Sequence, residues 1–175
     1  MGQRTVISFA ERKLDVGLWI FFLLNVLVVT YTADVEQLLI SDPDNFSYPI
    51  WPPPFVVDLL HDYFRDHDPL LYARPEWYRA IVAIDSLFYG PFYIAALYAF
   101  WKGREWIRNW CLIWAAVMLA TVTVILVEEV AGPYATDHLP LVLATNAGWL
   151  LVPVVVLIRM WGEHPFTRPA ESSPA

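Results

Sequence analysis

Four long apolar segments alternate with polar connections along the chain. They run approximately over residues 16–33, 80–101, 110–127 and 139–158. Each is close to the roughly 20 residues with which an α-helix crosses about 30 Å of hydrocarbon. The pattern therefore predicts an all-α fold, an integral membrane four-helix bundle, as a single domain over residues 1–162. The polar, Pro-rich tail over residues 163–175 is expected to be disordered.

Basic residues are spread unevenly over the connections. Eight of the eleven Lys and Arg residues fall on the side of both termini, whereas only Arg65, Arg74 and Arg79 fall in the connection between the first two segments. Because positively charged loops remain in the cytoplasm, both termini are predicted to be cytoplasmic. The expected location is the plasma membrane if the chain is bacterial, or the endoplasmic reticulum if it is eukaryotic.

The connection over residues 34–79 begins with a proline-rich stretch and then takes on helical apolar spacing. Phe55, Leu59, Leu60 and Phe64 would share one helix face, which predicts a short helix over the outer mouth of the bundle. The histidines and aspartates at 61–68 contain no pair of histidines four residues apart. We therefore interpret that cluster as a solvated polar face and expect no metal site.

Composition supports a lipid environment and narrows the classes of partner. Of the 175 residues, 58% are hydrophobic and 16% aromatic, more apolar surface than a soluble domain of this size needs. The net charge of −7 argues against a nucleic-acid partner, because a phosphate backbone requires a clustered basic face. The single cysteine, Cys111, excludes an internal disulfide and is expected to be a buried apolar residue. No cofactor is expected.

The polar residues within or at the ends of the apolar segments are the candidates for function, because ionised groups in hydrocarbon are costly. Alternating helix direction brings six of them to the outer half of the bilayer: Asp34, Asp85, Glu128, Glu129, Asn146 and Trp149. One or more from each helix would face a common centre, which indicates a pocket. Pro91 and Pro153 each remove a backbone donor at this depth and would help to open a cavity, although packing alone also explains them.

Such a pocket would support two kinds of chemistry. Two adjacent carboxylates in a low-dielectric site cannot both ionise, so Asp34 and Asp85 would share one proton. A neutral acid can protonate an alkene, and the face of the Trp149 indole can stabilise the resulting cation or a ligand ammonium. The same residues would therefore serve an acid–base isomerase or a receptor for amines and lipids. The alternatives are a structural pair for the aspartates and headgroup contacts for Glu128 and Glu129.

The stretch HDPLLYARPEWYRAIVAIDSLFYGPFYIAALYAFWKGREWIR, from His67 to Arg108, resembles the core of the EXPERA family. That family includes a sigma-two receptor branch and an emopamil-binding sterol isomerase branch. The resemblance extends from Val16 to Trp161 and implies a lipid-accessible cavity for sterols or cationic amphiphiles, and often a homodimer. It also implies the same four-helix layout with cytoplasmic termini.

Individual positions match different branches of the family. By resemblance, Asp34 and Asp85 fall at the ligand-pairing acids of the receptor branch, and Asp68 matches its loop aspartate. Asn146 and Trp149 instead resemble the asparagine and tryptophan of the isomerase branch. The His and Glu of the isomerase branch have no clear match, and Asn25 stands among the residues in their place.

We therefore predict a pocket in the outer half of the bilayer that binds a sterol-like or isoprenoid lipid. The leading hypothesis is proton transfer to a double bond, as isomerisation or cyclisation, with Asp34, Asp85, Glu128 and Glu129 as catalytic candidates. Asn146, Trp149, Tyr89 and Asn25 are the substrate-binding candidates, and Asp68 is a structural loop residue. The alternative is a non-catalytic receptor or lipid-handling protein that uses Asp34 or Asp85 as a counter-ion.

Overall fold

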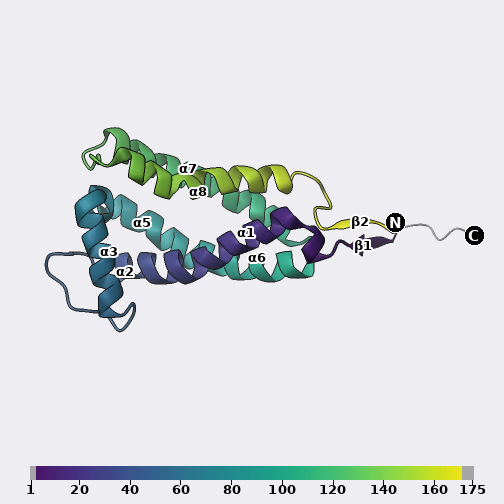
Figure 1. Cartoon of the computed structure of the whole chain (residues 1–175), viewed down its shortest axis with the longest axis horizontal. Coiled ribbons are helices and arrows are strands. Elements are labelled where there is room, and N and C mark those ends of the chain that lie inside the picture. Colours follow the sequence, from purple (N-terminus) through teal and green to yellow (C-terminus); the bar gives the residue numbers. More distant parts are fainter. Residues whose placement is uncertain (1–2, 171–175) are drawn as a thin grey trace, which may run out of the picture.

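Four long helical spans form the body of the molecule in the computed structural model, which describes residues 3–170 (Figure 1). The first span, Lys13–Leu39, consists of α1 (Lys13–Leu24), the π-helix η2 (Asn25–Asp34) and α2 (Val35–Leu39). The second, Glu76–Lys102, consists of α5 (Glu76–Ile84), the π-helix η3 (Asp85–Tyr89) and α6 (Gly90–Lys102). The third and fourth are α7 (Ile107–Ala131) and α8 (Leu139–Arg159).

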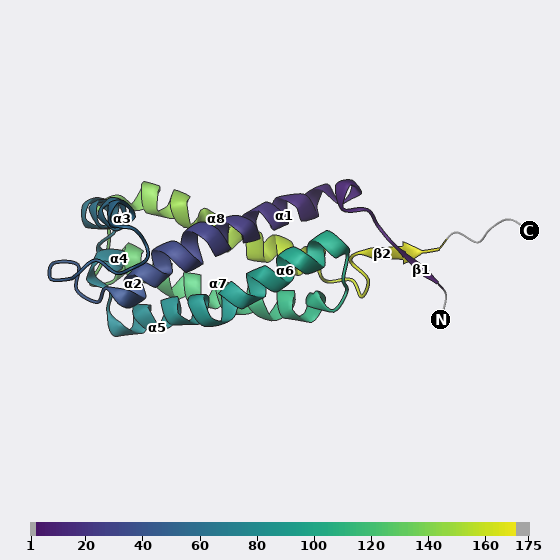
Figure 2. The same cartoon turned by 90° about the horizontal axis from the view of Figure 1, so that it is seen from below.

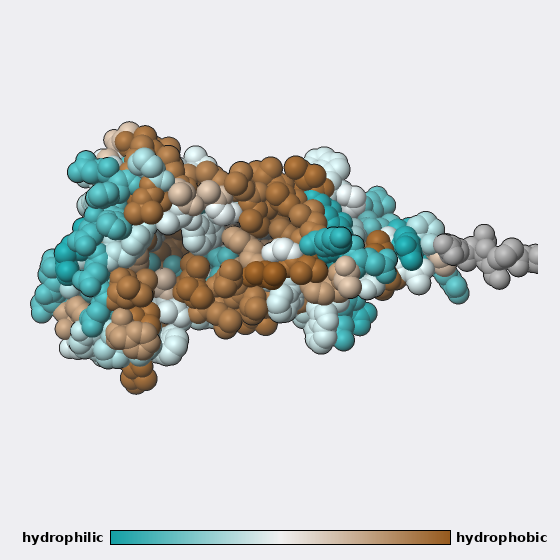
Figure 3. Space-filling view, viewed as in Figure 1, coloured by the Kyte–Doolittle hydropathy of each residue, from teal (hydrophilic) through white to brown (hydrophobic). Residues whose placement is uncertain are grey.

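All four spans are long and apolar enough to cross a membrane. The space-filling view shows an apolar band around the middle of the bundle, with polar residues concentrated towards both of its ends (Figure 3). A bilayer would cover that band and leave both ends in water. The predicted all-α membrane bundle is therefore confirmed, and each span is longer than the sequence pattern predicts.

Both described chain ends lie at one end of the bundle, and the connection between the first two spans lies at the other (Figure 2). That connection contains α3 (Pro54–His67) and α4 (Pro69–Ala73), which lie across the helix ends. We call α3 and α4 the cap, and the end of the bundle that they cover the cap end. The predicted short helix over the mouth of the bundle corresponds to α3.

The inward face of α3 differs from the predicted one. Val57, His61 and Phe64 are the buried residues, whereas Phe55 is 70% exposed and Leu59 67%. The cause is a buried charge cluster that the sequence pattern did not indicate: both guanidinium ends of Arg74 donate to Glu36, at 3.0 and 2.9 Å. His61 Nε2 lies 2.7 Å from the same carboxylate, which turns the helix inward on its His61 side.

The interpretation of residues 61–68 as a wholly solvated face is therefore wrong for two members. His61 is 4% exposed and Asp68 is 2% exposed. Asp62 and Asp66 are exposed, as expected. Burial of a charged group requires a partner or a proton, so the two buried members need a structural or functional explanation.

The two π-helices lie side by side at the position of the candidate aspartates. A π-turn is rare and shifts the direction of the side chains that follow it. Gly90 directly after η3 allows the close approach, because a Cβ there would lie 2.5 Å from the Tyr31 hydroxyl on η2. The first two spans therefore touch where Asp34 and Asp85 lie.

An aromatic core fills the half of the bundle nearer the termini. Phe22, Tyr93 and Trp114 are buried, with ring centroids of Phe22 at 5.8 Å from Tyr93 and 5.4 Å from Trp114. Edge-to-face and stacked contacts of this kind add to the energy of simple burial. Because this half is densely packed, the pocket lies in the half of the bundle nearer the cap.

The chain ends pair with each other. Strand β1 (Arg4–Val6) pairs antiparallel with β2 (Thr167–Pro169), and the short 3₁₀-helix η1 (Phe9–Glu11) leads into α1. Disorder was expected from residue 163, but Phe166 is fully buried against Phe100, which anchors the tail through β2. Arg159 also bonds both carboxylate oxygens of Asp15, at 2.8 and 2.9 Å. The end of the expected disordered tail, 171–175, lies outside the described residues.

Candidate ligand-binding site

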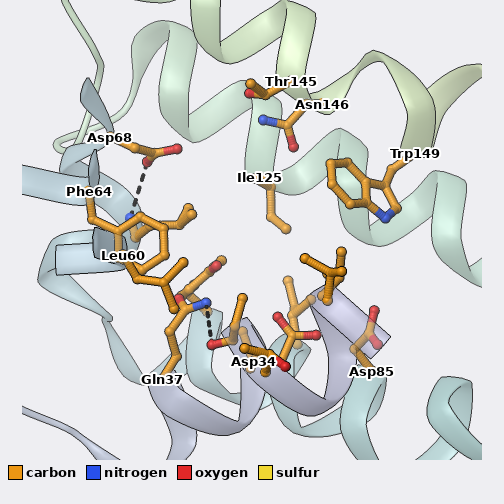
Figure 4. A pocket seen from close by; sticks show the side chains of 18 of the residues that line it. Asp34, Gln37, Leu60, Phe64, Asp68, Asp85, Ile125, Thr145, Asn146 and Trp149 are labelled. Carbon is orange, nitrogen blue, oxygen red and sulfur yellow. Dashed lines mark hydrogen bonds between the residues drawn. The ribbon is translucent and has the colours of Figure 1, made fainter. Parts of the chain in front are cut away.

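A pocket of about 390 Å³ lies between the four spans beneath the cap (Figure 4). Its walls are mostly apolar, with Val82, Met118, Val122 and Ile125 among them. Six of the nine predicted site residues line it: Asp34, Asp68, Asp85, Tyr89, Asn146 and Trp149. The structure therefore brings residues from all four spans and the cap to one cavity.

Asp34 and Asp85 lie on neighbouring spans on the same side of the pocket (Figure 4). Asp34 ends η2 and Asp85 begins η3, and these two helices contact each other. Asp34 is 8% exposed, and its Oδ2 has no hydrogen-bond partner within residues 3–170. We call Asp34 and Asp85 the acid pair.

Thr30 supports the acid pair from the first span. Its hydroxyl donates to Asp85 Oδ1 at 2.6 Å, and the side chain is fully buried. Thr30 was absent from the predicted site, although it precedes Asp34 by one turn and so lies on the same side of the helix. That spacing was the signal in the sequence.

Trp149 and Asn25 form a direct pair across the bundle. The indole N–H of Trp149 donates to Asn25 Oδ1 at 2.8 Å, and the Asn25 amide donates to the Phe21 carbonyl at 2.9 Å. Asn25 is 2% exposed and does not line the pocket. Asn25 thus orients the indole from behind, while the indole itself faces the cavity (Figure 4).

Asn146 lies one turn before Trp149 on α8, also at the pocket wall. Its amide N–H₂ donates to the Val142 carbonyl at 2.9 Å, which leaves its carbonyl oxygen without a partner among the hydrogen bonds described. Tyr89, on η3, also lines the pocket, and its buried hydroxyl has no partner in the described part of the chain. Both are available to a polar group of a ligand.

Glu128 and Glu129 differ from each other, and neither lines the pocket. Glu128 accepts a hydrogen bond from the Tyr134 backbone N–H at 3.0 Å and so closes the turn after α7. Glu129 is 1% exposed, and neither of its carboxyl oxygens has a partner within residues 3–170. Glu128 is therefore a turn residue, whereas Glu129 is a buried acid.

Asp68 lies at the N-terminus of α4, where its Oδ1 accepts from the Leu71 N–H at 3.1 Å. This bond fits the structural role that was expected, but Asp68 also lines the pocket. Burial raises the pKa of Asp68 above its usual value, against the opposing effect of the backbone hydrogen bonds. Gln37 and Tyr78 line the same region and were absent from the predicted site.

The pocket contains acids but no resident base. No Lys, Arg or His is found among the residues that line it, and none of the ion pairs formed within residues 3–170 includes Asp34 or Asp85. An apolar cavity of this kind, with several unpartnered carboxyl oxygens, is electrostatically suited to a ligand that brings a cation or hydrogen-bond donors.

The fold and this site define a class: a multi-pass membrane protein with a buried acidic pocket. A family model described as EXPERA (EXPanded EBP superfamily) matches residues 55–160, which include α3 to α8. The chain belongs to this family. The match covers Asp68, Asp85, Asn146 and Trp149 but begins after Asp34.

Curated relatives extend the similarity to the first span. The chain is 30% identical over 156 residues to "Sigma intracellular receptor 2" of Xenopus tropicalis, with 81% of this chain and 86% of that protein covered. It is 28% identical over 165 residues to the Homo sapiens protein of the same name, with 86% and 89% covered. The relatives are thus similar over nearly their whole length.

Proposed function

We propose that this chain is a membrane receptor or lipid-handling protein that binds a cationic amphiphile, with the acid pair as counter-ion. The observation that carries the proposal is the acid pair itself, which lies in an apolar pocket without a resident basic residue. A protonated amine that enters the pocket would supply the positive charge that the acid pair lacks. Its apolar body would fill the walls of the cavity.

The role of each residue follows from its contacts. Thr30 occupies Oδ1 of Asp85 and fixes its carboxyl group, so the remaining oxygens of the acid pair face the ligand. The Trp149 ring, held by Asn25, offers its face to the cation or to an apolar ring. The similarity to proteins named as receptors favours binding as the primary activity.

The test is direct binding of an amphiphilic tertiary amine to the purified protein. Asp85→Asn and Asp34→Asn keep the side-chain shape but remove the charge, so each should lower affinity about thirtyfold or more, from roughly 2 kcal/mol for a buried charge pair. Glu128→Gln is the matched control, because Glu128 does not line the pocket and glutamine keeps an acceptor for Tyr134 N–H. Full amine affinity in both aspartate variants would reject the proposal.

A second candidate function is acid–base isomerisation or cyclisation of an isoprenoid or sterol-like lipid. The observation that favours it is that two carboxyl groups from neighbouring helices and an oriented indole line the same pocket. One acid would protonate an alkene carbon, the Trp149 face would stabilise the cation, and the conjugate base would take a proton from the adjacent carbon. Incubation with candidate polyenes in heavy water tests this, since turnover would incorporate deuterium into the recovered lipid.

A further inference from the structure

We propose that the pocket has a second acidic binding point at its cap end, formed by Asp68 with Glu129 behind it. It would bind a second basic or hydrogen-bond-donating group of the ligand. The inference rests on the proposed function and narrows it: the preferred ligand is an amphiphile with polar groups at both ends of an apolar body.

Glu129 lies on the side of α7 that faces the pocket. On α7 it follows Ile125 by four residues and Val122 by seven, and both of these line the pocket. Residues at these spacings share one helix face, so Glu129 continues the pocket face towards the cap. Hydrogen bonds of Thr136 connect the same two regions. Its N–H donates to the Glu129 carbonyl, and its hydroxyl donates to the carbonyl of His67, which precedes Asp68.

Several buried polar atoms near the cap end have no hydrogen-bond partner within residues 3–170. Glu129 is 1% exposed, and both of its carboxyl oxygens lack a hydrogen-bond partner within the described chain. Gln37, on α2, is 2% exposed and lines the pocket, yet its Oε1 also has no partner there. The hydroxyl of Tyr63, on α3, shares this property. Buried polar atoms without partners are costly, and Gln37 and Tyr63 bring theirs to the pocket that Asp68 lines.

The two acids lie on helices that touch each other. Asp68 is at the start of α4, Glu129 is on α7, and α4 contacts α7. The arginines of residues 65–79 are paired with other carboxylates: Arg74 with Glu36, Arg65 with Asp62, and Arg79 with Glu76. None of the ion pairs formed within residues 3–170 includes Asp68 or Glu129. The basic side chain next to Asp68 in the chain is His67, whose buried Nδ1 has no partner in the described part of the chain. A cation or donor from a ligand would give the two acids a partner.

The two acidic points lie apart. Figure 4 shows Asp68 across the pocket from Asp85, with Ile125 between their positions. One Asp68 oxygen is occupied by Leu71 N–H, and the second points away from that bond towards the cavity (Figure 4). Two acidic points with apolar walls between them match a ligand with two polar ends.

The experiment compares a graded series of α,ω-diaminoalkanes with the 1-aminoalkanes of the same length, by calorimetric titration of the detergent-purified protein. We expect a chain length at which the wild type binds the diamine more tightly than the monoamine. Glu129→Gln should lower diamine affinity about tenfold more than monoamine affinity, since only the diamine reaches both points. Glu128→Gln should preserve the preference, because the Glu128 carboxylate accepts from the Tyr134 N–H in the turn after α7 and glutamine keeps that acceptor.

Asp68→Asn provides a second variant, because its amide oxygen still accepts from Leu71 N–H and keeps the start of α4 intact. It should reduce the diamine preference in the same way. Monoamine binding that depends on Asp85, with no diamine preference at any length or with equal losses for both series in Glu129→Gln and Asp68→Asn, would overturn this inference alone. Failure of both series to bind a folded wild type would overturn the proposed function with it.

Discussion

The Trp149 indole N–H on α8 donates to Asn25 Oδ1 on η2 at 2.8 Å, which links the fourth span to the first at the wall of the pocket. Asn25 is buried, so this acceptor cannot be replaced by bulk water. Residues 124 positions apart in the chain thus fix the ring that faces the ligand.

Asn25→Leu should therefore destabilise the protein by about 1–3 kcal/mol, the cost of leaving the buried indole N–H without a partner. Thermal unfolding in detergent measures the loss. Trp149→Phe removes the same donor, so the double variant should lose less stability than the sum of the two single changes. Strict additivity would mean that the hydrogen bond contributes nothing.

The buried cap cluster of Glu36, Arg74 and His61 yields a second stability prediction. Arg74→Leu leaves a buried carboxylate without its bidentate partner and should cost about 3–5 kcal/mol, measured by thermal unfolding. Arg65→Leu is the matched control, because the Arg65–Asp62 pair is more than half exposed on both sides and should contribute less than about 1 kcal/mol. Equal effects of the two changes would show that the cluster does not hold the cap.

Asp68 predicts a pH dependence of stability. Its folded-state pKa is raised by burial, so the folded protein binds more protons than the unfolded chain between the ordinary Asp pKa and the raised value. Asp68 should therefore lower stability progressively as pH rises through that window. In Asp68→Asn this decrease should be smaller, as measured by unfolding temperature over an acidic to neutral pH series. An identical pH profile in the variant would contradict the assignment.

The uneven distribution of basic residues predicts that both termini are cytoplasmic and that the cap lies on the opposite side of the membrane. In a Cys111→Ala background, which removes a buried thiol, Asp62→Cys on the cap should react with an impermeant maleimide in intact cells. Glu163→Cys, near the described C-terminal end, should react only after permeabilisation. The reverse labelling pattern would place the termini outside.

The sequence pattern predicted the four spans and the convergence of Asp34, Asp85 and Trp149, because helix period, helix direction and depth are local properties. It did not predict the cap cluster. Glu36 meets Arg74 and His61 across 38 and 25 residues, and no local spacing encodes that contact. The side of α3 that is buried is determined by the contact of His61 with that cluster, and not by the most apolar side of the helix.

Glu128 and Glu129 illustrate the same limit at one helix end. They are neighbours with the same chemistry, yet a rotation of about 100° per residue points one to the turn and the other into the bundle. Their difference depends on the rotation of α7 against α8 and the cap, which only the packed structure defines. Pairing of the chain ends through β1 and β2 is likewise a contact between residues far apart in sequence.

The proposed function requires the acid pair to recognise a positive charge. The most direct measurement is the affinity of the wild type for an amphiphilic tertiary amine, relative to the neutral analogue in which carbon replaces the nitrogen. We predict at least about a thirtyfold preference for the amine, from roughly 2 kcal/mol for a buried charge pair, and its loss in the Asp34→Asn/Asp85→Asn double variant. Equal affinity for the two ligands in the wild type would contradict the account.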